Sequence, residues 1–220
     1  PISALYLELG CIPVKYLMMY KRVMYLHHIL NVEDERLIQQ VLVAQMESPS
    51  KGDWFLQIME DLKELDLEHI TFDEMKGMKK YKMKKLVKNA CSNVAFKYLN
   101  EKRGSKMENL SYKEFKIKEY LVSEKITLPE KKILFKLRTN MAPVSSNFGD
   151  KNKTCPACFI ACDNQQHLIE CVVIKCLNKT VLYNQASVEY MDIFSEDLSK
   201  LKEAAKIFAA TLKTRQSITS

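Results

Sequence analysis

Three cysteines and one histidine in the C-terminal third of the chain have the spacing of a metal site. Cys155, Cys158, His167 and Cys171 form a C-x2-C-x8-H-x3-C pattern. Thiolates and an imidazole at these intervals can close a tetrahedron around one zinc ion. A tight turn would supply the first two ligands, and His167 and Cys171 would share a helix face because they lie four residues apart. Four protein ligands leave no position for water, so we expect a structural rather than a catalytic zinc ion.

Two further cysteines lie close enough to this pattern to compete for the metal. Cys162 lies four residues after Cys158, and Cys176 lies five residues after Cys171. A second possible register therefore uses Cys158, Cys162, His167 and Cys171. A third interpretation is a group of reduced cysteines without a metal, two of them buried beside a helix.

The composition predicts a helical protein of a reducing compartment. Gly and Pro are scarce, at 5 and 6 of 220 residues, and Lys, Leu, Glu and Met are frequent, which favours helix over sheet. No run of about 18 apolar residues predicts a transmembrane helix, and no signal peptide is visible. Without a secretory signal, seven cysteines, partly clustered with a histidine, indicate metal binding rather than disulfides. Because the chain begins at Pro1 rather than Met, we expect a piece of a longer protein.

Positive charge is concentrated in the middle of the chain. The net charge is +7, and residues 76–138 contain 19 Lys or Arg against 6 Glu and no Asp. A basic block of this size is typical of binding to a phosphate backbone. A lysine-rich helix face that only keeps the protein soluble is the alternative interpretation. The residues that we expect to contact nucleic acid are Lys79, Lys80, Lys82, Lys84, Lys85, Lys88, Lys131, Lys132, Lys136 and Arg138.

Helical periodicity predicts an all-α fold. We expect an irregular multi-helix domain at 1–140, a linker at 141–154, a zinc-knuckle module at 155–178 and a C-terminal helical segment at 179–220. No segment has the pattern of a convincing strand. Capping residues mark several helix ends: Ser3, Gly10, Pro13, Asp34, Thr71 with Glu74, Ser111 with Glu114, Thr127 with Glu130, and Ser195. Ser111 and Glu114 predict the start of a helix that reaches about Val122.

Two adjacent histidines, His27 and His28, lie in the helix expected after Pro13. Consecutive residues point in different directions on a helix, so we expect one at the edge of the core and one at the surface. A phosphate group bound beside Lys21 and Arg22 is the alternative role for this pair.

Four sequence blocks occur in an order that resembles one protein family. They are LYLELGCIPVKYLMMYKRVMYLHHIL, AQMESPSKGDWF, LRTNMAPVSSNF and CPACFIACDNQQHLIEC. In this order they resemble the C-terminal part of reverse transcriptases from LINE-type (non-long-terminal-repeat) retrotransposons, from about Leu5 onward. The resemblance implies thumb or linker helices at 1–140, after the polymerase palm, and then a zinc knuckle. Cys162 has no counterpart in the family pattern, which favours the first register. The implied zinc ligands are Cys155, Cys158, His167 and Cys171, with Asp163 as the family's acidic residue before the histidine.

The same resemblance implies a function. In such proteins this region helps to hold template RNA and target DNA for target-primed reverse transcription. We therefore expect RNA, DNA or both as partners, the remainder of a reverse transcriptase polypeptide, no membrane, one structural zinc ion, and an intracellular, nuclear location. The polymerase's metal-binding Asp-Asp turn and a nuclease constellation are both absent from the sequence, so we do not expect this chain to be catalytic alone.

A structural or protein-interaction domain derived from such an element is the alternative function. Clustering of the basic residues on one surface would favour nucleic-acid binding, and an even distribution would favour the alternative. Phe159 and Ile160, between the two pairs of metal ligands, are candidates for an exposed apolar contact with unpaired bases. Either side chain could instead pack beneath the zinc loop.

Overall fold

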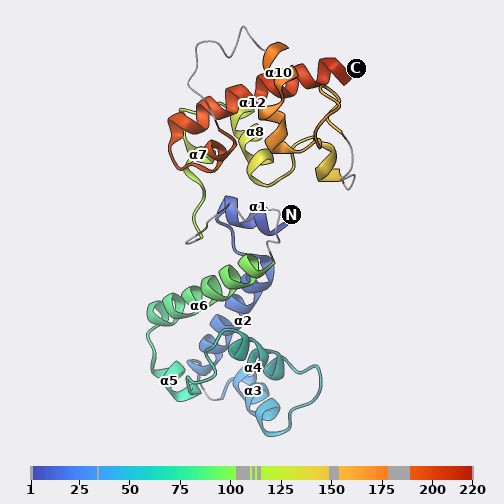
Figure 1. The fold of residues 1–220 in the computed structure, drawn as a ribbon. Helices are drawn as coiled ribbons and strands as arrows, with labels where there is room; N and C mark the ends of the chain where they lie inside the picture. Colours follow the sequence, from blue (N-terminus) through green and yellow to red (C-terminus); the bar gives the residue numbers. More distant parts are fainter. Residues whose placement is uncertain are drawn as a thin grey trace. The chain divides into compact units, whose positions relative to one another are not determined.

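The computed structural model describes residues 2–33, 35–102, 110, 112, 115–148, 154–177 and 189–219. Every regular element in these ranges is a helix, and the one β-type pairing among them is an isolated antiparallel bridge between Thr154 and Cys162 (Figure 1). The predicted all-α fold class is therefore confirmed. Taken singly, no described helix is long and apolar enough to cross a membrane; on length and composition alone, Ile2–Leu9 and Val14–Leu30 pass that test together as a bent pair.

The helices belong to two compact units. Unit 1 combines Pro1–Gly10 with Arg103–Ser220, and unit 2 is Cys11–Lys102. This division differs from the boundary expected at 141–154, because residues on both sides of that segment share one hydrophobic core. Leu137 and Leu168, for example, belong to the same buried cluster of unit 1.

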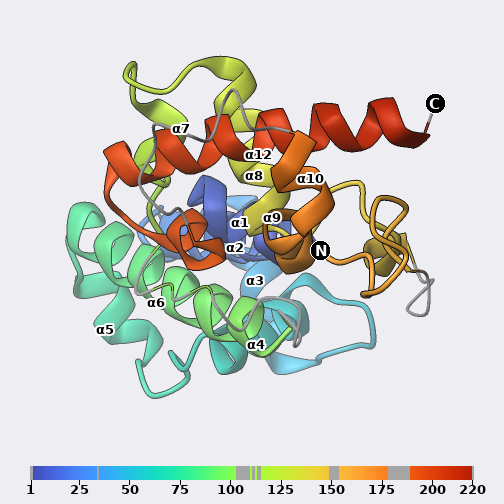
Figure 2. The ribbon, with the colours of Figure 1, turned by 45° about the horizontal axis from the view of Figure 1, so that its top comes forward.

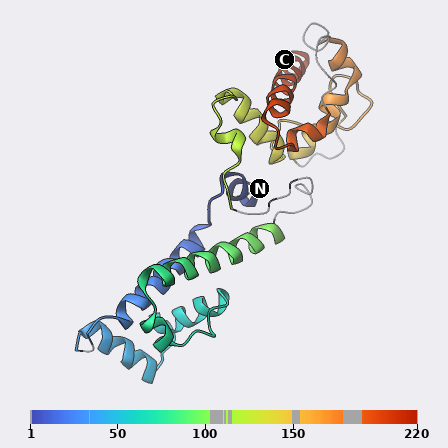
Figure 3. The same ribbon diagram turned by 90° about the vertical axis from the view of Figure 1, so that its left-hand side faces the viewer.

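Unit 2 is built around α2 (Val14–Leu30), which packs along the length of α6 (Lys80–Glu101) (Figure 3). The sequence of α2 is apolar on more than one face, which suits a central position. Shorter helices contact it as well, and Val23 and Leu26 are completely buried among them. These helices are α3 (Leu37–Glu47), α4 (Trp54–Glu64) and α5 (Phe72–Gly77).

Unit 1 is organised around α12 (Leu198–Thr219), which packs across α8 (Leu128–Arg138) (Figure 2). The apolar positions of α12 recur at helical spacing, and Leu201, Ala204 and Phe208 among them are buried in the unit. Further elements contact α12 in unit 1: α7 (Glu119–Val122), α9 (Gln165–Glu170), α10 (Val172–Leu177) and the 3₁₀ helix η3 (Tyr190–Phe194).

The first helix of the chain, α1 (Ile2–Leu9), ends at a position that requires glycine. Gly10 has φ +62°, in the left-handed region. A Cβ atom there would collide with the backbone of Lys116 and Ile117. The chain thus approaches the end of α1 more closely than any side chain would permit, and the predicted helix stop at Gly10 is confirmed.

This close approach explains why a predicted helix is shorter than expected. The backbone N–H of Lys118 donates to Glu8 O at 3.1 Å, so the chain before α7 is held against α1 and is not helical. The helix expected at 111–122 is therefore limited, in the described part of the chain, to Glu119–Val122. Its expected caps, Ser111 and Glu114, lie outside the described residues.

A buried polar network joins α1 to α8 within unit 1. Glu8 is completely buried and accepts hydrogen bonds from Tyr112 Oη at 2.6 Å and Tyr120 Oη at 2.7 Å. Nε of Arg138 donates to both carboxylate oxygens of Glu8, at 3.1 and 3.3 Å, and Nη1 donates to Ile193 O at 2.7 Å. A buried carboxylate and a buried guanidinium are tolerated here because each is paired and hydrogen-bonded.

Two of the predicted capping boxes are confirmed. Thr71 and Glu74 bond reciprocally at the start of α5, and Thr127 and Glu130 do the same at the start of α8. Each box satisfies backbone N–H groups that a helix start leaves without partners. Local spacing alone was sufficient to find both helix starts.

Of the other expected helix ends, the cap at Ser195 was wrong and the cap at Asp34 cannot be compared; the expected linker also contains regular structure. The hydroxyl of Ser195 accepts from Asp197 N but does not cap α12; the carboxylate of Asp197 does so, accepting from Ser199 N at 2.8 Å. Asp34 lies outside the described residues, and Arg36 occupies the N-cap position of α3. The expected linker at 141–154 contains a short 3₁₀ helix, η2 (Ser145–Phe148), and contributes buried Ala142 and Val144 to the core.

Candidate metal centre and basic pocket

A tight turn presents the first two candidate metal ligands. The N–H of Cys155 donates to Ala161 O at 2.7 Å, and the N–H of Phe159 donates to Cys155 O at 2.9 Å. Phe159 has φ +58°, and this left-handed residue reverses the chain just after Cys158. The closed turn holds Cys155 and Cys158 with both sulfur atoms on one side.

A short helix presents the other two candidates. Asn164 is the N-cap of α9, and its Oδ1 accepts from His167 N at 2.8 Å. The helix then ends at Cys171, whose N–H donates to His167 O at 2.7 Å. One helical turn therefore separates the imidazole from the third thiol, as the four-residue spacing predicted.

The four side chains converge on one point. The sulfur atoms of Cys155, Cys158 and Cys171 and a ring nitrogen of His167 all lie within 4.8 Å of one another. Cys155 Sγ is 3.9 Å from Cys171 Sγ, and Cys158 Sγ is 3.3 Å from His167 Nε2. Ligands at ordinary zinc distances in a tetrahedron would be about 3.8 Å apart for two sulfurs and about 3.6 Å for sulfur and nitrogen. The cluster could hold a metal ion and is compatible with zinc.

The geometry also distinguishes the two possible registers. Cys155 is buried and belongs to the cluster, whereas Cys162 is exposed and does not. Cys162 instead forms the isolated backbone bridge with Thr154 that closes the base of the turn. Cys176 is exposed as well and also lies outside the cluster. The alternative set with Cys162 in place of Cys155 is therefore not the one that the fold assembles.

The backbone around the turn favours a thiolate at one of the cysteines. The N–H groups of Ala161 and Ile160 point at the sulfur of Cys158, and together with His167 they lower the pKa of that thiol to about 6. Burial has the opposite effect on Cys155 and raises its pKa. A bound cation would supply the charge that keeps the buried thiol ionised.

Asp163 connects the cluster of three cysteines and one histidine to the rest of unit 1. Its carboxylate is buried and accepts from the N–H of Ser145 at 2.8 Å and from the Ser145 hydroxyl at 2.7 Å. Nη2 of Arg215, near the end of α12, donates to the same carboxylate oxygen at 2.5 Å. The resemblance singled out Asp163, but its partner Arg215 could not be found from sequence, since 52 residues separate the two.

Gln165 forms a second connection that sequence reasoning missed. Its Oε1 accepts from Ala142 N at 3.1 Å, and its Nε2 donates to Leu137 O at 3.0 Å. The side chain is buried, so these bonds are shielded from water. Asp163 and Gln165 thus hold the metal cluster against the end of α8 and the segment that follows it.

Two apolar side chains project into solvent from the turn that carries Cys155 and Cys158. Phe159 is 74% exposed and Ile160 is 87% exposed. The alternative that either side chain packs beneath the turn is therefore excluded. Their display on a short turn closed by hydrogen bonds leaves both available for contact with another molecule.

The predicted nucleic-acid contacts fall into two groups. The six lysines at the N-terminal half of α6 belong to unit 2, and every one is exposed: Lys79, Lys80, Lys82, Lys84, Lys85 and Lys88. The other four residues lie on α8 in unit 1. There Lys132 and Lys136 are exposed and Lys131 is half-buried, but Arg138 is only 4% exposed and is paired with Glu8. The Arg138 guanidinium therefore belongs to the buried polar network of unit 1 and does not face a ligand.

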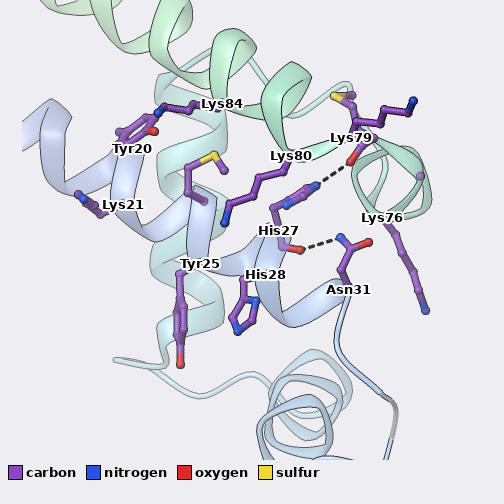
Figure 4. Close-up of a pocket in the computed structure, with 13 residues that line it drawn as sticks. Tyr20, Lys21, Tyr25, His27, His28, Asn31, Lys76, Lys79, Lys80 and Lys84 are labelled. Carbon is purple, nitrogen blue, oxygen red and sulfur yellow. Dashed lines mark hydrogen bonds between the residues drawn. The ribbon is translucent and has the colours of Figure 1, made fainter.

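An open pocket of about 740 Å³ gathers part of the first group between α2 and the start of α6 (Figure 4). Its lining includes Lys21, Lys76, Lys79, Lys80 and Lys84 and, among the residues that the structure describes, no aspartate or glutamate. In the same described part of the chain, Lys21, Lys79, Lys80 and Lys84 form no ion pair. Within the described part of the chain, the lining of the pocket therefore carries an excess of positive charge.

The two histidines have different positions beside this pocket. His27 is buried, and its Nε2 donates to Met78 O at 2.9 Å, which fixes the bend that precedes α6 (Figure 4). His28 is exposed and faces the pocket. The prediction of one core-edge and one surface histidine is confirmed. Arg22, in contrast, is engaged by buried Asp61, with Nη2 donating to Oδ1 at 2.7 Å.

Comparison with known proteins adds no relative. No protein-family model, curated protein or solved structure matches the chain. The cluster of three cysteines and one histidine and the basic pocket are features of the described residues from which a function can be inferred.

Proposed function

We propose that this chain is a zinc-stabilised nucleic-acid-binding region that acts as part of a LINE-type reverse transcriptase, after the polymerase palm. In this role it would position template RNA or target DNA for target-primed reverse transcription. The observation that carries the proposal is the exposed lysine surface at the start of α6, together with the lysine-lined pocket beside it. The order of the four sequence blocks supports the family assignment.

Zinc is the metal that suits the cluster best. Three cysteines and one histidine are a donor set that zinc prefers, and four protein ligands would complete its tetrahedron. No open position would remain for a water molecule or a substrate, so the role would be structural. The ion would join the turn at Cys155 and Cys158 to the helix that carries His167, and it would stabilise the display of Phe159 and Ile160.

The lysine surface would supply affinity without base recognition. Exposed ammonium groups neutralise backbone phosphates and release the counterions that surround nucleic acid. Such contacts fix position along the backbone but do not read sequence. Lys80, Lys84 and Lys88 recur every four residues and so line one stripe of α6, which is suited to follow a phosphate backbone.

The proposal is tested by the salt dependence of binding. Fluorescence anisotropy with labelled RNA and labelled duplex DNA would be measured across a salt series for the full chain and for a triple alanine variant at Lys80, Lys84 and Lys88. The log–log slope should fall in magnitude by about 2–3, since each lost contact contributes about 0.7–0.9. The loss should be similar for unrelated sequences.

A matched control removes the same charge from unit 1. Lys175, Lys206 and Lys213 are exposed on α10 and α12, and their triple alanine variant should change the slope much less. Equal losses in the two variants would mean that binding responds only to net charge. Absence of binding by the unaltered chain at low salt would overturn the proposal.

One observation favours the alternative of a protein-interaction domain. α3 exposes apolar side chains at Leu37 (75%), Val41 (48%) and Met46 (40%), which would suit contact with another protein. Under that alternative the lysines would only keep the chain soluble. The same anisotropy series separates the two functions, because the alternative predicts no binding of nucleic acid at low salt.

A further inference from the structure

The basic pocket of unit 2 combines its charge with an aromatic surface. Tyr25 and His28 lie on the same side of α2, with ring centroids 6.2 Å apart and planes tilted by 33° (Figure 4). Tyr25 is 46% exposed and His28 is exposed, so the outer face of this ring pair is open to solvent. Trp54 supports the Tyr25 ring from the protein side, edge to face, at a centroid distance of 5.6 Å.

The lysines line the same pocket as this ring pair. Lys80 and Lys84 reach from α6 toward α2, and Lys21 extends from α2 itself (Figure 4). The bond between His27 and Met78 fixes the start of α6 relative to α2, so the charges and the rings are held in one arrangement. The pocket therefore has a charged part and an aromatic part on a common support.

We propose that this pocket binds single-stranded nucleic acid, with backbone phosphates on Lys80, Lys84 and Lys21 and an unpaired base stacked on the Tyr25–His28 pair. A positive groove next to exposed rings is the combination that binds single strands, because every base has a π-face that can stack. A duplex offers only its phosphates to such a pocket, since its base faces are already stacked. This inference rests on the proposed function and specifies its ligand as the single strand.

The test uses three labelled probes of equal length with the full chain: an oligo(dA) single strand, its duplex with oligo(dT), and an abasic single strand. The abasic strand keeps the phosphates and removes the bases. Trp54 is the only tryptophan, so its emission reports directly on the ring pair. The oligo(dA) strand should bind more tightly than the other two probes and should change the Trp54 emission, whereas the abasic strand should not.

Matched variants separate the rings from the charges. Tyr25→Leu should weaken oligo(dA) binding about 5- to 100-fold and leave abasic-strand binding unchanged. Tyr81→Leu is its control, because Tyr81 is 64% exposed on α6 but lies outside the pocket. If the Tyr25 variant loses its helical circular dichroism and has therefore unfolded, His28→Ala tests the ring pair in its place, since His28 is exposed. Its expected effect has the same direction.

A second pair of variants tests the charges of the pocket. Double replacement of Lys80 and Lys84 by Ala should weaken all three probes more than double replacement of Lys97 and Lys102, which are exposed toward the C-terminal end of the same helix and lie outside the pocket.

The possible outcomes have distinct meanings. Equal affinity for oligo(dA) and the abasic strand, or equal effects of the Tyr25 and Tyr81 variants, would overturn the single-strand site while leaving nucleic-acid binding intact. Failure of all three probes to bind at low salt would overturn the proposed function and this site together. Tight binding of the oligo(dA) strand that depends on Tyr25 but not on Tyr81 would support both.

Discussion

Replacement of Glu8 by Gln should destabilise unit 1 severely without altering its shape. The substitution keeps the size of the side chain and removes its charge. Glu8 is completely buried, and its carboxylate accepts hydrogen bonds from Tyr112, Tyr120 and Arg138. In the variant the Arg138 guanidinium, only 4% exposed, would remain charged without its counterion.

The expected loss in the free energy of unfolding is about 3–5 kcal/mol, the usual cost of breaking a buried ion pair by removing one partner. The neutral amide would also be a weaker acceptor for the tyrosine hydroxyls than the carboxylate. Arg138→Met should lower the free energy of unfolding by a similar amount, because it leaves the buried Glu8 carboxylate without its cationic partner. The double variant should be less unstable than the sum of the two single variants, by up to about 3 kcal/mol, since it leaves neither charge alone.

Urea denaturation followed by circular dichroism would measure these changes for the whole chain. Trp54 fluorescence gives a parallel reading of unit 2, which the substitution does not touch. Glu196→Gln is the matched control: Glu196 is 85% exposed in its pair with Lys118, and its loss should cost less than about 1 kcal/mol. The reasoning is refuted if Glu8→Gln costs no more than this control, or if the two single losses simply add.

Two further predictions concern the metal and the pH. Metal analysis of the purified chain under reducing conditions should find about one zinc ion per molecule. Cys155→Ala or His167→Ala should remove the zinc ion, whereas Cys162→Ala should not. Unaltered protein that contains no zinc would contradict the site. Burial raises the pKa of Tyr16 to about 12 and raises that of Tyr120 above its ordinary value. The stability that these protonated hydroxyls contribute is fully present below about pH 10 and is lost as the pH rises through the raised pKa values. Tyrosinate absorbance should therefore show a late step that coincides with loss of the helical circular dichroism, and early, gradual titration of all the tyrosines would contradict this.

Features that depend on local spacing were predictable from the sequence. The capping boxes at Thr71 and Thr127 require only residues three positions apart, and the structure contains both. The metal cluster is also local: a two-residue turn and one helical turn determine most of its geometry. Sequence reasoning could therefore name its four ligands and favour Cys155 over Cys162, and the fold assembles that set.

Features that depend on distant partners were not predictable. Arg138 was expected to contact nucleic acid because it lies in a basic stretch, but charge does not indicate exposure, and its partner Glu8 is 130 residues away. The helix expected at 111–122 is shortened because α1 binds the backbone of the preceding segment at Lys118. The basic pocket likewise combines α2 with the start of α6, and no local pattern shows that Tyr25 and Lys84 share it.

The position of α1 in unit 1 has a consequence for folding during synthesis. Glu8 is made before its partners Tyr112, Tyr120 and Arg138, which follow 104, 112 and 130 residues later. Unit 2 is one continuous segment, so its core can form while the ribosome still extends the chain. α1 must therefore wait, with the Glu8 carboxylate in water, until Tyr112, Tyr120 and α8 follow. We therefore expect unit 1 to close last, in a slow step set by the long sequence separation of its central contacts.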